Sequence, residues 1–123
     1  MEERRNWGRI VDITGSLEPR NINAANVAKA GVHIWSKGLA SEVGKMGITV
    51  NCLGPGRIHS EQIDNRLHPA PQDQAQFAAA NIPLGYFGDP DDVAYAVAFL
   101  CALKARYLTG QRMYVDGGMH RAL

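Results

Sequence analysis

The chain has 123 residues and a net charge of +1, with 46% hydrophobic and 20% charged residues. This balance is typical of a globular domain, and the near-neutral charge gives no electrostatic basis for binding nucleic acid or a membrane surface. No apolar run reaches the ~18 residues that a membrane span needs, and the charged residues 1–6 do not open a secretory signal. We therefore expect a single domain over residues 1–123, located in the cytoplasm.

The first predicted strand covers residues 9–13, because this run is short, rich in β-branched residues and closed by Thr14-Gly15-Ser16. A polar loop with Pro19 follows. Residues 24–45 are rich in helix-forming residues and predict a long helix that ends at a pair of glycines. Its apolar residues spread over a wide stripe, which indicates a helix covered on more than one side. The members of this stripe are Val27, Ala28, Ala30, Ile34, Trp35, Leu39 and Val43.

Residues 48–53 form the second predicted strand, which Gly54-Pro55-Gly56 interrupts sharply. The polar residues 59–81 follow, with two prolines and weak helical character over 73–80. We expect this excursion to be mobile and to cover a site.

Asp89-Pro90 begins the next predicted helix, because aspartate is a frequent N-cap and proline fits the first turn. That helix covers residues 91–103, and residues 111–116 form the third predicted strand. Strands that alternate with helices predict parallel βαβ units. The fold class is therefore α/β, with about three strands and two main helices.

Such a thin sheet leaves its first strand as an unpaired edge and cannot cover all apolar faces of the long helix. We therefore expect association, either as a homo-oligomer or as a complex with a homologous subunit. The four histidines are scattered with no cysteine or carboxylate at metal-ligand spacing, so we expect no metal site.

Five motifs in order carry a family resemblance: residues 8–16 (GRIVDITGS), 28–32 (AKAGV), 47–58 (GITVNCLGPGRI), 82–90 (IPLGYFGDP) and 107–118 (YLTGQRMYVDGG). Together they resemble the C-terminal half of a short-chain dehydrogenase/reductase. The resemblance implies half of a Rossmann-type, doubly wound parallel sheet. It also implies relatives that oxidise or reduce carbonyl and alcohol groups with NAD or NADP.

In the resembled family a serine follows the strand, and a tyrosine and a lysine stand four residues apart on the next helix. The tyrosine is the general acid/base, and the lysine lowers its pKa and holds the cofactor ribose. Lys29 matches the lysine, whereas Ala25 stands at the tyrosine position and has no ionisable group. Gly15 stands at the serine position, and the resemblance leaves Ser16 or Thr14 to take that role.

The resemblance also implies contacts to the nicotinamide end of the cofactor from Pro55, Gly56, Ile58 and Ser60. The alternative is a rigid strand-to-loop corner that serves folding. The glycine-rich turn that binds the cofactor pyrophosphate has no match in this chain. We therefore expect weak or absent binding of NAD or NADP by the chain alone.

Three functions follow from this pattern. The first is a catalytically impaired relative of NAD(P)-dependent oxidoreductases, either truncated or a pseudoenzyme. The second is one component of an active NAD(P)-dependent oxidoreductase that a missing N-terminal half completes. The third is a non-catalytic assembly subunit for a homologous dehydrogenase.

Overall fold

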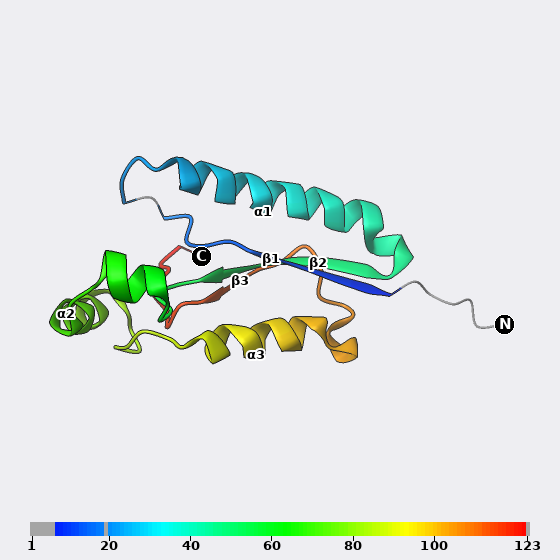
Figure 1. The fold of residues 1–123 in the computed structure, drawn as a ribbon. Helices are drawn as coiled ribbons and strands as arrows, with labels where there is room; N and C mark the ends of the chain where they lie inside the picture. The colour runs from blue at the N-terminus through cyan, green and yellow to red at the C-terminus, as the bar shows by residue number, and fades with distance from the viewer. Residues whose placement is uncertain (1–6, 19, 123) are drawn as a thin grey trace.

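The computed structural model describes residues 7–18 and 20–122, which form three layers. A parallel sheet lies in the middle, with helix α1 on one face and helix α3 on the other (Figure 1). The strands stand in the order β1-β2-β3. Their bounds are Gly8–Ile13 for β1, Ile48–Pro55 for β2 and Arg112–Val115 for β3. The predicted α/β fold class and the predicted strands are confirmed, and β2 runs two residues further than predicted.

The central strand β2 holds the main core, because it is paired on both sides and covered on both faces. Val50 and Leu53 are completely buried. The polar Asn51 is buried too, and its side chain satisfies the next turn: it donates to the Leu108 carbonyl and accepts from the Gln111 backbone N–H. The turn before β3 is therefore fixed in place by a strand side chain.

Helix α1 spans Ala24–Val43 and begins at an N-cap, where the Asn23 side chain accepts from the Ala25 N–H at 2.9 Å. Its buried face consists of His33, Ser36 and Ala40. The predicted apolar stripe is therefore wrong as a description of the buried face. Ser36 faces the sheet because its hydroxyl donates to the Asp12 carboxylate on β1 at 2.5 Å.

Helix α3 spans Pro90–Cys101 and covers the opposite face of the sheet. The Asp89 N–H donates to the Asp92 carboxylate at 2.7 Å, which satisfies one of the free donors at the helix start. Leu100 is the buried residue of this helix. The predicted aspartate-proline start is confirmed.

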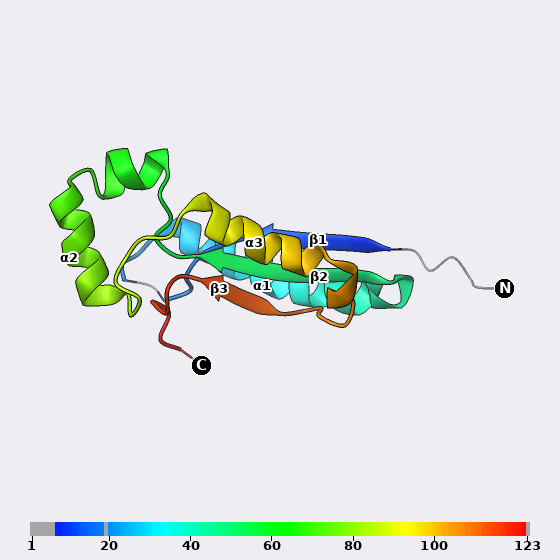
Figure 2. The same cartoon turned by 90° about the horizontal axis from the view of Figure 1, so that it is seen from below.

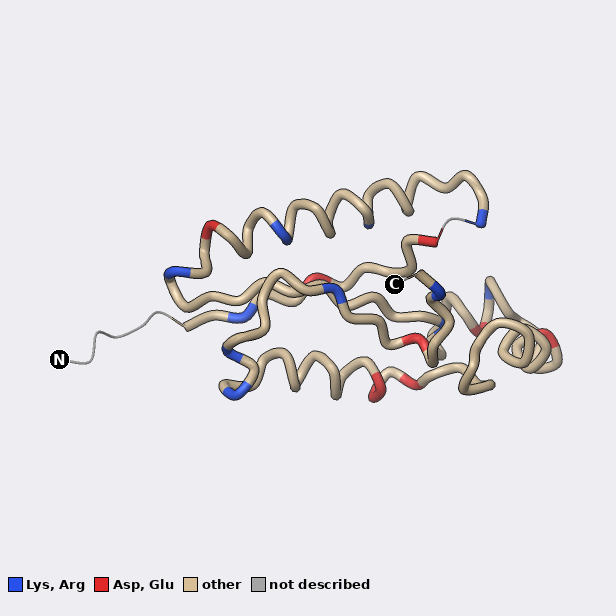
Figure 3. The backbone as a smooth tube through the Cα atoms, turned by 180° about the vertical axis from the view of Figure 1, so that it is seen from behind, with Lys and Arg blue, Asp and Glu red and all other residues tan. Residues whose placement is uncertain are grey.

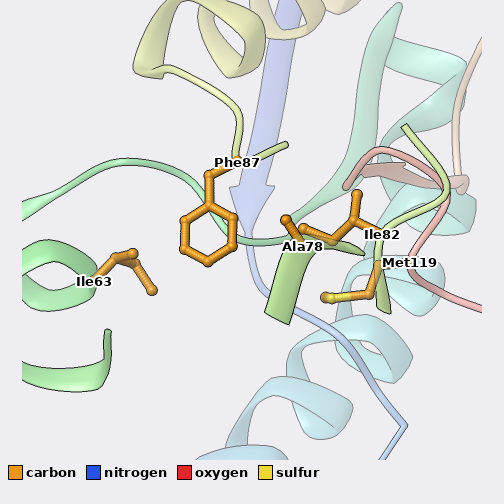
Figure 4. Close-up of a cluster of buried hydrophobic side chains, with 5 residues drawn as sticks. All are labelled: Ile63, Ala78, Ile82, Phe87 and Met119. Atoms are coloured by element: carbon orange, nitrogen blue, oxygen red, sulfur yellow. The ribbon is translucent and has the colours of Figure 1, made fainter. Parts of the chain in front are cut away.

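The excursion between β2 and α3 lies beyond the carboxyl end of the sheet (Figure 2). It contains a π-helical turn, Ile63–Leu67, which the sequence did not predict, and helix α2, Pro71–Asn81, which extends the weak helix predicted there. A separate apolar cluster supports it (Figure 4). Its buried members are Ile63, Ala78, Ile82, Phe87 and Met119. Within the described residues, no helix has both the length and the hydropathy to cross a bilayer.

Candidate functional site

A cavity of about 530 Å³ lies at the carboxyl end of the sheet. Its walls come from the segment after β1, the first turns of α1, the end of β2 and the start of the excursion. This is the edge at which open α/β sheets usually bind ligands, because the loops that follow parallel strands meet there. Every site residue predicted from the sequence lines this one cavity: Ser16, Lys29, Pro55, Gly56, Ile58 and Ser60, together with Ala25.

Lys29 projects from α1 toward the segment after β1. A Cβ atom built on Gly15 would lie 2.9 Å from the Lys29 Nζ atom, which is closer than such atoms normally approach. A side chain at this position would therefore have to displace the ammonium group. Because the end of a lysine side chain is flexible, this contact places the ammonium group beside Gly15 but does not by itself require glycine there.

Ala25 lies on the same cavity wall, one helical turn before Lys29. Its side chain is a methyl group, so it offers no proton and no hydrogen bond to a bound molecule. Asn26, beside it, also lines the cavity. An amide does not ionise at ordinary pH, so it cannot act as the general acid in place of a phenol.

Thr14 and Ser16 both line the cavity, but their hydroxyl groups are committed differently. The Thr14 Oγ1 atom lies 2.6 Å from Nε2 of the buried His33. The Ser16 Oγ atom accepts from the Glu18 N–H at 3.1 Å, which leaves the hydroxyl proton of Ser16 available among the described residues. Ser16 is thus the better donor to a bound oxygen.

The end of β2 forms the opposite wall. A Cβ atom on Gly56 would lie 2.6 Å from Cβ and 2.8 Å from Cα of Asp116, so glycine is required there for packing against the end of β3. Ile58 forms a β-bridge with Gly88, and the Ser60 hydroxyl accepts from the Ile63 N–H at 3.3 Å. These contacts show that this strand-to-loop corner serves folding, and its residues also line the cavity.

Three basic side chains line the cavity, namely Arg20, Lys29 and Arg57, against the single acid Glu18. Figure 3 shows basic and acidic residues close together at the end of the molecule that carries α2. Burial lowers the pKa of Arg57 from its usual value, and the charge of Arg20 lowers it further. Sequence reasoning missed both arginines and also His33.

His33 lies between the cavity and a second groove of about 520 Å³, which α1 forms with β2 and the start of β3. Burial lowers the pKa of His33, and the charge of Arg112 adds to this effect. Its Nδ1 atom is buried and has no hydrogen-bond partner among the described residues. The neutral imidazole is therefore the form that this position favours.

Residues 1–120 match the family model described as Enoyl-(Acyl carrier protein) reductase. The chain is 42% identical over 119 residues to the 3-oxoacyl-[acyl-carrier-protein] reductase FabG of Rickettsia prowazekii, covering 94% of this chain and 48% of that protein. It is 40% identical over 113 residues to the (2S)-[(R)-hydroxy(phenyl)methyl]succinyl-CoA dehydrogenase subunit BbsD of Thauera aromatica, covering 90% and 44%.

A solved structure gives a similar result. The chain superposes on YwfH, described as an NADPH dependent reductase involved in Bacilysin biosynthesis, with a TM-score of 0.85 and 32% sequence identity. The match covers 94% of this chain and 48% of that one. The chain thus spans about half the length of the relatives that it matches.

Proposed function

Because this chain belongs to the short-chain dehydrogenase/reductase family, we propose that it forms the substrate-side half of an NAD(P)-dependent oxidoreductase fold acting on carbonyl or alcohol groups. We further propose that it is catalytically impaired as it stands. One observation supports the proposal of impairment. Lys29 and Ala25 line the same cavity, and Ala25 stands at the position where the family has its general acid.

The described residues fit the nicotinamide end of such a cofactor. Ile58, Ser60 and Lys29 line one cavity, and the ammonium group of Lys29 lies beside Gly15, which has no side chain. The backbone at Ile58 and the hydroxyl of Ser60 would hold the nicotinamide, and the ammonium of Lys29 would hold its ribose. When bound, the nicotinamide supplies or accepts the hydride.

The remaining steps depend on the chain's own side chains. The Ser16 hydroxyl donates a hydrogen bond to the substrate oxygen and orients it. Lys29 places a positive charge near that oxygen. Reduction of a carbonyl also needs a proton at the oxygen, and Ala25 cannot give one. General acid catalysis typically contributes about 10²–10⁴-fold, and this is the loss that we assign to the position.

Two observations bear on the alternatives. The chain spans about half of its relatives, so a completing half would supply the pyrophosphate contacts in the second reading. The exposed apolar side chains Ile34 and Trp35 on α1 favour the third reading, an assembly subunit for a homologous dehydrogenase. Both alternatives place the chain in the same family. In the second it contributes residues to an active site, and in the third it contributes only to assembly.

Calorimetric titration and turnover assays test the proposal. We expect the chain to bind NADH or NADPH more weakly than micromolar, which corresponds to about −8 kcal/mol. We expect no oxidation of NADPH over a panel of ketones and aldehydes, and no rescue by Ala25→Tyr alone, because the pyrophosphate contacts stay absent. Lys29→Ala serves as the matched variant. Turnover by the unmodified chain that Lys29→Ala abolishes would overturn the impaired reading and favour an active enzyme.

A further inference from the structure

Two arginines that are far apart in the sequence meet over one phenyl ring. The Arg57 Cζ atom lies 4.8 Å from the centroid of the Phe77 ring, and the Arg20 Cζ atom lies 5.4 Å from the same centroid. A phenyl face attracts a cation modestly. That attraction has to offset the mutual repulsion of two positive charges. Burial is the main cause of the lowered pKa of Arg57, and this repulsion lowers it further.

Arg57 is held in one orientation by a chain of hydrogen bonds. Its Nε–H donates to Nε2 of His68 at 3.2 Å, and therefore His68 carries its proton on Nδ1 and donates to Asp73 at 2.9 Å. The His68 ring is buried against Phe77 and Phe87, with centroid distances of 4.7 and 5.3 Å. This arrangement fixes Arg57 through Nε alone.

The other donors of this guanidinium have no acceptor among the described residues. Arg20 makes one long hydrogen bond to the Asn81 side chain at 3.4 Å. Within residues 7–18 and 20–122, neither arginine forms an ion pair with a carboxylate. Glu18, the acid on the cavity wall, instead accepts from the backbone N–H groups of Arg121 and Ala122 at 2.6 and 2.9 Å.

The cavity therefore carries uncompensated positive charge around a partly buried, oriented guanidinium. Guanidinium groups bind carboxylate and phosphate oxygens through paired N–H donors, and partial burial strengthens such bonds. We propose that Arg57 and Arg20 form a receptor for an oxyanion, carboxylate or phosphate, on the molecule that enters the cavity. This inference rests on the proposed function, because the anion would be part of the substrate. The substrate class is then an oxo or hydroxy compound that carries a negative charge.

The test uses NMR spectra of the arginine Nε–H groups in the whole chain, without any nicotinamide cofactor. Succinate and inorganic phosphate are the probes, and succinamide is the matched neutral probe. We expect saturable shifts of the Arg57 Nε–H signal with one or both anions and none with succinamide. The anion that binds more tightly identifies the group as carboxylate or phosphate.

Variants separate a receptor from a purely structural stack on Phe77. Arg57→Gln and Arg20→Gln should each weaken anion binding about tenfold or more, measured from the Nε–H signal of the arginine that remains. Arg57→Lys should retain part of the binding, because it keeps the charge and loses the paired donors. Arg106→Gln, in the connection between α3 and β3 and outside the cavity lining, is the control and should change nothing. Equal shifts with succinamide, no shift with either anion, or the same affinity in Arg57→Gln and Arg106→Gln would each overturn the proposal. A failed cofactor titration would leave this result standing, since no cofactor is present in the assay.

Discussion

The excursion between β2 and α3 and the long helix α1 bury their side chains in opposite ways. The excursion is polar in sequence, yet it contributes Ile63, Ala78 and Phe87 to a buried cluster. Helix α1 is rich in apolar residues, yet Ile34 and Trp35 are 77% and 59% exposed. Its sheet-facing side is polar instead. The comparison shows that burial follows the available partner atoms, because Thr14 and Asp12 on the sheet side satisfy polar residues of the helix.

The largest effect should come from the core of the excursion. Phe87 is 7% exposed and contacts the rings of His68 and Phe77. We expect Phe87→Ala to lower the free energy of unfolding by about 3–5 kcal/mol, because it removes a large buried side chain and leaves a cavity. Denaturant unfolding measures this loss. Tyr86→Ala is the control, since Tyr86 is 61% exposed, and equal losses in the two variants would show that the cluster does not stabilise the excursion.

The opposite behaviour is expected on α1. Trp35→Glu should change the stability of the individual chain little, because the side chain is largely exposed. It should weaken self-association about tenfold or more, since covering a large apolar side chain contributes roughly 1.5–3 kcal/mol. Light scattering at micromolar concentration measures the assembly, with Met46→Glu as an exposed control elsewhere. A wild-type chain that is monomeric there and indifferent to Trp35→Glu would contradict the prediction.

The sequence predicts the strands and both main helices well, because each depends on local signals. The site residues came from the family resemblance, and the structure shows that they line one cavity. Asp89-Pro90 begins α3 where predicted, and Lys29 and Ser60 meet at one cavity although 31 positions separate them. The buried face of α1 was misassigned, since a hydrophobic stripe carries no information about polar partners on a strand. The pairing of Arg20 with Arg57 was missed because it depends on how α2 places Phe77. The sequence signal that could have indicated this pair is Arg57, a basic residue directly after Gly54-Pro55-Gly56.

The smallest expected effect is a pH dependence of stability that comes from His33, on the buried polar face of α1. Because the pKa of His33 is lowered from 6.5 by burial, the folded chain binds fewer protons there than the unfolded chain does below pH 6.5. Stability should therefore be complete above pH 6.5 and should fall as the pH is lowered from there. The carboxyls with lowered pKa values, Glu18 and Asp64, contribute only near and below pH 4.5, so the interval above that value reports on histidine.

His33→Gln should flatten this slope, since glutamine does not titrate and can still hydrogen-bond to Thr14. Thermal unfolding at a series of pH values between 6.5 and 4.5 measures it. His59→Gln is the control, because the His59 side chain is 39% exposed and lies in the excursion. If stability still falls with pH in His33→Gln but no longer does so in His59→Gln, the prediction is wrong. The pH dependence of stability would then come from the excursion and not from His33 on α1.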